Sequence, residues 1–186
     1  MGHHRSIRLR GYDYTQGGGY FITLVADRGQ CLFGAIERGV VAFSIYGRMV
    51  ETEWRRTGEL RANVVLDEYV VMPNHFHGIL LVKDDGRGTA RGAPTTVERF
   101  SRPTEGSVPT IVRSFKSAVT KAVNRARQTP GARVWQRNYY EHVIRYEESL
   151  SEIRGYIACN PARWAFEREN ARGAGAEYLR RSSGNL

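Results

Sequence analysis

The sequence lacks any long hydrophobic run and contains little cysteine. Nowhere do about 18 apolar residues follow one another, so we expect no membrane-spanning helix. The N-terminal segment MGHHRSIRLRG lacks the apolar stretch of a secretory signal, which predicts a cytoplasmic protein. Cys31 and Cys159 could pair only if the fold brought them together, and free thiols are expected in a reducing compartment. No thiolate cluster therefore competes as a candidate site.

Acidic residues are outnumbered by basic ones. The chain has 28 Lys plus Arg against 19 Asp plus Glu, a formal charge of +9 and a pI near 9.9. This balance favours a polyanionic partner, and the abundant arginines suit phosphate oxygens and can stack on bases. Many soluble proteins also have a basic pI, so charge favours a nucleic-acid partner without establishing one.

The length of 186 residues suffices for one hydrophobic core and is too short for two full domains. We expect a single domain over residues 1–172. A mobile loop is expected at 83–109, where Gly, Arg, Thr, Pro and Ser replace the hydrophobic periodicity. Residues 173–186, rich in Gly, Ser and charge, are expected to form a disordered tail.

Hydrophobic spacing predicts the element order strand, hairpin, helix, strand, strand, helix, strand, helix. Ser44 is the expected cap of the first helix, and Pro161 should stop or kink the last one. The expected strands and first helix lie at 20–25, 31–36, 40–43, 44–56 (helix), 68–72 and 75–82, with a later strand entered within 135–145. These pieces fit an α+β domain with an antiparallel sheet of about four or five strands and helices mainly on one face.

Two histidines open the strand at 75–82, in the segment DEYVVMPNHFHGILLV. His75 and His77 are two residues apart, so on a strand both rings lie on one face and can ligate one metal ion. The alternative is a solvated or hydrogen-bonded pair that binds nothing.

A second candidate lies in ESLSEIRGYIACNPARW, near the C-terminal end of the sequence. Tyr156 and Asn160 are four residues apart, which places them roughly 6 Å apart on one helical face. Their phenol and amide groups can therefore approach the same point. The structural alternative is a tyrosine at the edge of the core and an asparagine at a helix end.

Two imidazoles, an amide and a phenol together suit attack of a tyrosine hydroxyl on a phosphodiester, assisted by a divalent cation. Two neutral nitrogens and an amide oxygen fit Mg²⁺ or Mn²⁺ better than a closed zinc site. Tyr156 would become joined to the 5′-phosphate, which preserves the energy of the phosphodiester for rejoining.

Several motifs in combination resemble a known family. PNHFHG resembles the His-hydrophobic-His motif of the single-tyrosine HUH transposases, which are insertion sequence 200-like, and YIACNP resembles their nucleophile helix. With SIRLRGYDY, YFITL, CLFGAI, PTIVRSFKSAVTK and VWQRNYYEHVIR, the chain resembles the REP-associated tyrosine transposases from about Ser6 to Asn170.

The resemblance implies a ferredoxin-like fold and a role for each matching residue. His75 and His77 match the metal-binding histidines, and Tyr156 matches the tyrosine of the 5′-phosphotyrosine link. Asn160 lies where the wider superfamily often carries a glutamine as third ligand, so its residue type departs from the pattern. The implied partner is single-stranded DNA folded into hairpins or imperfect palindromes, bound near the nucleoid by a monomer or homodimer.

Further residues are candidates for contacts with DNA. Glu141 or His142 is expected to orient a metal ligand or a water, although adjacent strand residues point to opposite faces. For Tyr139 and Tyr140 the alternative is that they pack against neighbouring side chains, as aromatic residues on strands more often do. The candidate DNA contacts are Arg113, Lys116, Lys121, Arg137, Tyr139, Tyr140 and Arg145.

Two other functions use the same residues. A domesticated hairpin-DNA binder would bind DNA tightly without forming a covalent adduct. A replication initiator would use the same chemistry, but the chain carries neither a helicase nor a second catalytic tyrosine pair.

Overall fold

The computed structural model describes residues 12–83 and 105–167. The expected tail at 173–186 and most of the expected loop at 83–109 lie outside these residues. The element order agrees with the order predicted from the sequence. The elements are β1 (Gly18–Val25), the short 3-10 turn η1 (Asp27–Gly29), β2 (Gly34–Glu37), β3 (Val40–Phe43), α1 (Ile45–Glu59), β4 (Val64–Val71), β5 (His75–Val82), α2 (Val108–Arg127), β6 (Tyr140–Ile144) and α3 (Glu147–Glu167).

Four strands form one antiparallel sheet in the order β4-β5-β1-β6, and β2 pairs with β3 in a separate hairpin. Strand β5 has the bounds predicted from the sequence and occupies a central position between β4 and β1. Its pairing with β1 runs from Gly18 opposite Val82 to Val25 opposite His75. The histidine strand is thus held by backbone hydrogen bonds along both edges.

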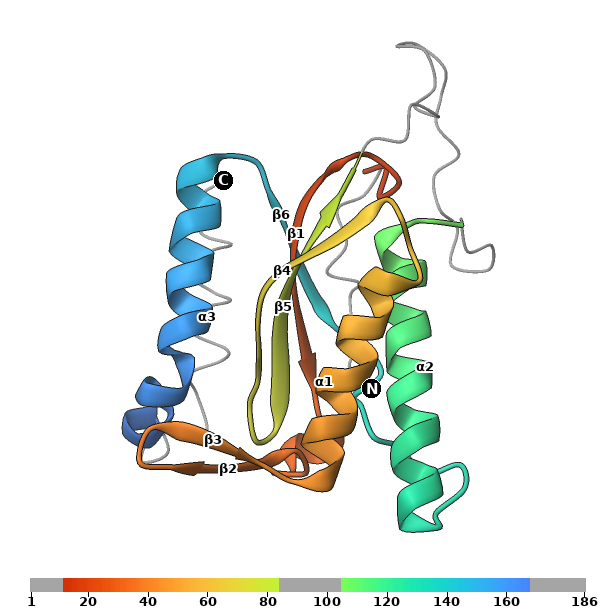
Figure 1. The fold of residues 1–186 in the computed structure, drawn as a ribbon, viewed down its shortest axis with the longest axis vertical. Helices are drawn as coiled ribbons and strands as arrows, with labels where there is room; N and C mark the ends of the chain where they lie inside the picture. Colours follow the sequence, from red (N-terminus) through yellow and green to blue (C-terminus); the bar gives the residue numbers. More distant parts are fainter. Residues whose placement is uncertain (1–11, 84–104, 168–186) are drawn as a thin grey trace, which may run out of the picture.

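Helices cover both faces of this sheet, with α1 and α2 on one side and α3 on the other (Figure 1). Ile22 of β1 belongs to the hydrophobic cluster that contains Trp54 of α1 and Phe115 of α2. Its neighbour Phe21 faces the opposite way and packs with Ile153 of α3. The expected α+β architecture, with most helices on one face, is confirmed, and it is consistent with a ferredoxin-like fold.

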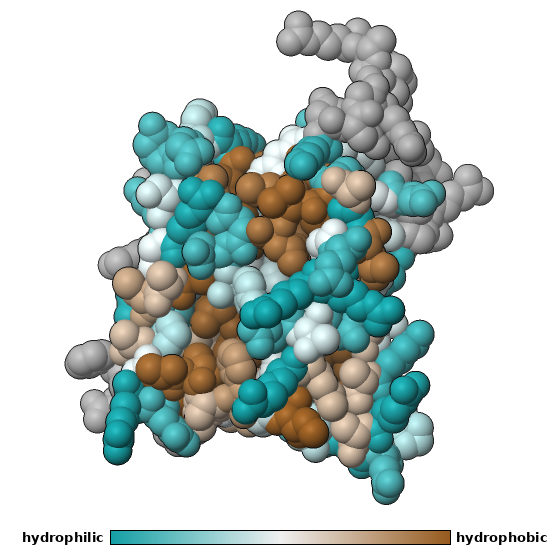
Figure 2. Space-filling view, in the orientation of Figure 1, coloured by the Kyte–Doolittle hydropathy of each residue, from teal (hydrophilic) through white to brown (hydrophobic). Residues whose placement is uncertain are grey.

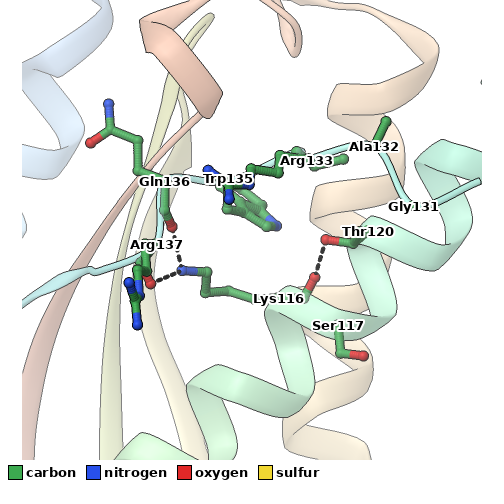
Figure 3. Close-up of a pocket in the computed structure, with 10 residues that line it drawn as sticks. Lys116, Ser117, Thr120, Gly131, Ala132, Arg133, Trp135, Gln136 and Arg137 are labelled. Atoms are coloured by element: carbon green, nitrogen blue, oxygen red, sulfur yellow. Dashed lines mark hydrogen bonds between the residues drawn. The ribbon is translucent and has the colours of Figure 1, made fainter. Parts of the chain in front are cut away.

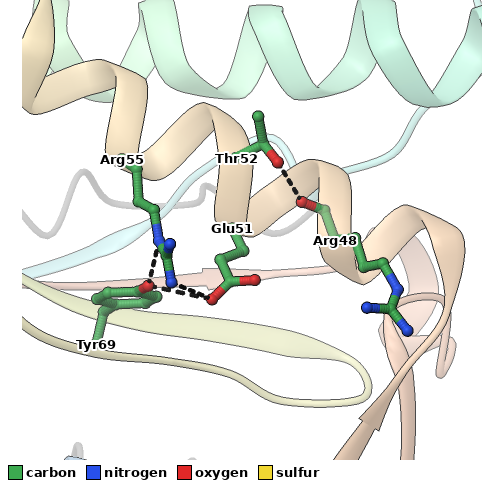
Figure 4. Close-up of polar contacts among 5 residues, drawn as sticks. All are labelled: Arg48, Glu51, Thr52, Arg55 and Tyr69. Atoms are coloured by element: carbon green, nitrogen blue, oxygen red, sulfur yellow. Dashed lines mark hydrogen bonds and ion pairs between the residues drawn. The ribbon is translucent and has the colours of Figure 1, made fainter.

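Helix α1 begins as the sequence predicts, because the Oγ of Ser44 accepts hydrogen bonds from two N–H groups of the first turn. A polar network ties the helix to β4 (Figure 4). Arg55 Nε donates to the hydroxyl of Tyr69 at 3.1 Å, and Arg55 Nη2 lies 2.8 Å from Glu51 Oε1. The helix is therefore anchored to the sheet by polar contacts as well as by its buried face.

Several boundaries differ from the sequence-based expectation, among them the start of α2 at Val108, inside the loop expected at 83–109. Strand β4 starts four residues early, at Val64, and its pairing with β5 shifts between Leu66 and Tyr69. Strand β2 is shorter than expected and starts at Gly34. Helix α3 does not stop at Pro161 but continues to Glu167. Its last turns lie off the axis of the earlier ones in Figure 1, as expected where a proline removes a backbone donor.

Hydrophilic side chains cover most of the face seen in Figure 2, and hydrophobic ones gather between α3 and α1. Among the described residues, none of the helices has the length and hydropathy required to cross a membrane. Cys31 and Cys159 are both exposed free thiols, in agreement with the expectation.

Candidate active site

The two histidines of β5 lie on the sheet face covered by α3. The ring centroids of His75 and His77 are 4.6 Å apart. Phe21, on the neighbouring strand β1, stacks on the His77 ring at 5.3 Å. The alternation of a strand therefore brings both imidazoles to one place, as the sequence predicted.

Helix α3 carries the predicted tyrosine and asparagine to the same place. The hydroxyl of Tyr156 lies 3.4 Å from Nε2 of His77, and the side chain of Asn160 is hydrogen-bonded to His75. Asn160 is buried, with 5% of its surface exposed. The four predicted side chains thus form one polar centre between β5 and α3.

The other ring nitrogen of each histidine has an oxygen partner that the sequence analysis missed. Nδ1 of His75 lies 2.6 Å from Oδ1 of Asn74, and Nδ1 of His77 lies 2.8 Å from Oγ1 of Thr23. Thr23 is directly opposite His77 across the β1–β5 pair. Asn74 could have been suspected from its place beside His75, whereas Thr23 is 54 residues away in sequence.

Burial keeps both imidazoles neutral. It lowers the pKa of His75 to about 4, although the hydrogen bond with Asn160 opposes the shift. Burial and the neighbouring His75 hold the pKa of His77 well below its usual value. Neutral imidazole is the form that binds a metal ion, so both rings are ready to act as ligands near pH 7.

The donor set fits a divalent cation with open positions. Both Nδ1 atoms have oxygen partners, which leaves the two Nε2 atoms and the Asn160 amide as donors. In the part of the chain that the structure describes, no group of three or more His, Cys, Asp or Glu is placed to hold a metal. The donors that the described residues offer at the site are therefore imidazole nitrogens and an amide.

The residues proposed to orient a ligand occupy other positions. Glu141 pairs with Ile22, so it faces the α1 and α2 side of the sheet and cannot contact the histidines. Among the described residues, neither oxygen of its buried carboxylate has a hydrogen-bond partner. His142 faces the α3 side, where it pairs with Phe21 rather than with Thr23 beside His77. Of the two residues, only His142 shares the face of the site, so the orienting role stays a prediction for His142 and not for Glu141.

The candidate DNA contacts of α2 lie on the opposite face from the histidines. Arg113 and Lys121 are exposed. The ammonium group of Lys116 instead donates to the backbone carbonyls of Gln136 and Arg137, at 2.8 and 3.3 Å (Figure 3). Burial lowers the pKa of Lys116 to about 8. This lysine therefore fastens α2 to the segment that leads into β6.

Lys116, Arg133 and Arg137 line an open cleft of about 470 Å³ between α2 and residues 131–137, with Trp135 at its side (Figure 3). Both arginines are exposed. The cleft is basic, and it lies on the α2 side of the sheet rather than at the histidines.

The remaining candidate contacts divide between the two faces. Tyr139 packs against the cluster under α1 and α2, and Tyr140 packs against the cluster under α3. Both rings are half-buried, so packing accounts for much of their surface. Arg145 is exposed just after β6.

The sheet order, the histidine pair on a central strand and the tyrosine on the covering helix define an α+β protein with a polar centre on one face. The same fold occurs in a REP-associated tyrosine transposase whose structure was solved bound to a REP hairpin. The two structures align with a TM-score of 0.55 and 21% sequence identity, over 88% of this chain and 74% of that chain. At this level of identity the likeness shows a shared fold.

The chain belongs to the same family as an uncharacterized protein of Haemophilus influenzae. The two sequences are 38% identical over 165 residues, which span 87% of this chain and 90% of the relative. A putative transposase from Deinococcus radiodurans R1 aligns with a TM-score of 0.40 and 19% identity, over 81% of this chain and 95% of that one. No family model matches the sequence.

Proposed function

We propose that this protein is a metal-dependent single-stranded DNA endonuclease and strand transferase of the transposase type, with Tyr156 as its nucleophile. The observation that carries the proposal is the 3.4 Å approach of the Tyr156 hydroxyl to Nε2 of His77. It occurs beside an apolar cluster formed by residues such as Phe21, Ile79 and Ile157. A polar centre built from two distant elements against such a core is typical of a functional site.

The roles of the residues follow from their chemistry. A divalent cation, Mg²⁺ or Mn²⁺, held by His75, His77 and Asn160 would polarise a phosphate oxygen and stabilise the departing 3′-oxygen. The Tyr156 oxygen bonds to phosphorus as the bond from phosphorus to the 3′-oxygen breaks. The phenol proton passes to water and the 3′-oxygen takes up a proton. The 5′-phosphotyrosine retains the energy needed to rejoin a strand.

The proposed substrate is single-stranded DNA that folds into a hairpin or palindrome. The REP-associated transposase with the same fold was bound to a REP hairpin, and the formal charge of +9 favours a polyanion. We place the protein in the cytoplasm, at the nucleoid, as a monomer or homodimer. One tyrosine per protomer means that complete strand exchange needs two protomers or sequential use of one tyrosine.

Covalent trapping tests the proposal directly. Purified protein is incubated with end-labelled hairpin DNA and Mg²⁺ or Mn²⁺, and a band of protein-linked DNA is sought on denaturing gels. We expect the band from the unaltered protein and none from Tyr156→Phe, because the phenylalanine has no oxygen to bond to phosphorus. Tyr146→Phe is the matched control, since Tyr146 is 69% exposed and lies just before α3; it should keep the band.

Two results would contradict this function. A band that persists in Tyr156→Phe would exclude Tyr156 as the nucleophile. Salt-sensitive hairpin binding without any adduct, in either metal, would instead identify a non-catalytic hairpin-DNA binder.

A further inference from the structure

A short turn next to the candidate metal site contacts one of its histidines and is itself hydrogen-bonded to another part of the chain. Residues 72–74 join β4 to β5, and Pro73 and Asn74 lie immediately before His75. The carbonyl of Asn74 accepts a hydrogen bond from the N–H of Ala26 at 2.8 Å, and the carbonyl of Pro73 accepts one from Phe33 at 2.9 Å. The turn is therefore fixed on both sides by backbone bonds to the segment that follows β1.

The Asn74 side chain is oriented by a third bond to the same segment. Its amide nitrogen donates to the carbonyl of Gly29 at 3.2 Å. Gly29 ends the turn η1 with a φ of +67°, a conformation that glycine adopts without strain. Because the NH₂ group points at Gly29, the amide oxygen must point the other way, and it lies 2.6 Å from Nδ1 of His75.

An amide oxygen can only accept a hydrogen bond. The short contact therefore requires a proton on Nδ1 of His75, and in neutral imidazole this leaves the lone pair on Nε2. The Asn160 amide, which also bonds to His75, offers donors and an acceptor and can meet either tautomer. The Thr23 hydroxyl at His77 can likewise donate or accept. Among these three partners, Asn74 alone dictates which nitrogen of its histidine carries the proton.

We infer that Asn74 is a positioning residue that holds His75 in the tautomer protonated at Nδ1, with Nε2 presented as the metal ligand. The inference rests on the proposed function for its purpose, because a fixed Nε2 lone pair serves a metal ion. The tautomer itself is a property of the metal-free protein. An experiment can therefore contradict the tautomer without contradicting the proposed function, and the reverse.

Nitrogen NMR of histidine-labelled protein tests the tautomer without metal or DNA. At pH 8, long-range coupling from ring carbon-bound protons distinguishes a protonated from an unprotonated ring nitrogen. We expect His75 to be protonated at Nδ1 in the unaltered protein and in Asn74→Asp, which keeps an oxygen acceptor. In Asn74→Leu, of similar size and without an acceptor, a substantial fraction should move to Nε2. Asn138→Leu, at an exposed position before β6, is the control and should leave His75 unchanged.

Calorimetric titration with Mn²⁺ measures the effect on the site. Loss of a partner that orients a metal-bound histidine typically costs about 10- to 100-fold in affinity, and we expect a loss in this range for Asn74→Leu and none for Asn138→Leu. A proton on Nε2 of His75 in the unaltered protein would overturn the inference, even if Asn74→Leu failed to fold. An unchanged tautomer in a folded Asn74→Leu would do the same. A tautomer that follows Asn74 without Mn²⁺ binding or adduct would leave the positioning role intact and refute the proposed function.

Discussion

At the scale of single residues, the two faces of β5 differ in how closely other side chains pack against them. His75 and His77 lie at a polar centre on one face. Gly78 follows His77 and lies on the other face, under a layer of aromatic rings. A Cβ on Gly78 would lie 2.7 Å from Cζ2 of Trp54 and 2.7 Å from Cζ of Phe76. Both rings are fully buried. The absence of a side chain at Gly78 thus allows α1 to approach the strand that carries the histidines.

Replacing Gly78 should therefore destabilise the protein. For Gly78→Ala we expect a loss of about 1–3 kcal/mol in the free energy of unfolding, the usual cost of overpacking a tight core. Denaturation by urea, followed by circular dichroism, measures it. Gly155→Ala is the matched control, because a Cβ there meets no described residue within 4 Å and alanine favours a helix over glycine by roughly 0.8–1.0 kcal/mol. If both variants shifted in the same direction, the packing argument would be wrong.

At the scale of elements, α3 is held to the sheet by an ion pair as well as by its apolar face. Arg154 Nε lies 2.8 Å from Oδ1 of Asp67, and Arg154 Nη2 lies 2.6 Å from Oδ2. Asp67 lies in the register shift of β4, and such irregularities redirect side chains. Arg154 precedes Tyr156 by two residues. The pair therefore fixes the part of α3 that carries the proposed nucleophile.

This ion pair predicts a pH dependence of stability. The hydrogen bonds from Arg154 hold the pKa of Asp67 below its ordinary value of 3.8. Because the folded pKa is the lower one, the stabilisation is complete above the unfolded pKa and is lost as the pH falls through the folded pKa. Asp67→Asn should thus be less stable than the unaltered protein at pH 7, and the difference should shrink as the pH falls below 3.8 and through the folded pKa. Thermal unfolding across this range measures it, with the exposed Glu37→Gln as control; a difference that persisted at low pH would point to another cause.

The sequence predicted the bounds of an element well where a single local signal, such as a helix cap or a turn motif, determines them. Ser44 capped α1 as expected, and the proline-asparagine turn set the start of β5 at His75. The start of β4 was missed because the register shift at Asp67 breaks the two-residue alternation. Pro161 did not end α3. A helix packed on a sheet can continue past a proline, since the packing offsets the lost hydrogen bond.

The composition of the candidate site was predicted only in part. Spacing within β5 and within α3 was enough to pair His75 with His77 and Tyr156 with Asn160. The contact of Thr23 with His77 depends on which strands are neighbours and in what register, and the sequence does not specify that. The same missing information left the face of Glu141 undecided.

At the scale of the whole molecule, the exposed cations of α2 and the candidate active site lie on different sides of the sheet. The exposed cations of α2, Arg113, Lys121 and Arg125, are across the sheet from Tyr156. Arg145 is exposed beside the edge strand β6. DNA that touched both α2 and Tyr156 would have to pass around an edge of the sheet.

The salt dependence of DNA binding tests the role of the α2 face. The affinity for hairpin DNA should fall with salt, and each lost phosphate contact should reduce the logarithmic slope by about 0.7–0.9. We expect the double variant Arg113→Gln, Lys121→Gln to have a smaller slope than the unaltered protein. Arg38→Gln, in the exposed β2–β3 turn, is the control. An unchanged slope in the double variant would place the DNA elsewhere.

The separation of the histidines from the tyrosine along the chain also bears on synthesis. Tyr156 follows His77 by 79 residues, and α3 is the last of the described elements. On the ribosome, β5 therefore emerges long before the helix that brings the nucleophile to it. A nascent chain would present the histidines while still unable to cut, so its proposed chemistry would begin only after α3 had emerged and docked on the sheet.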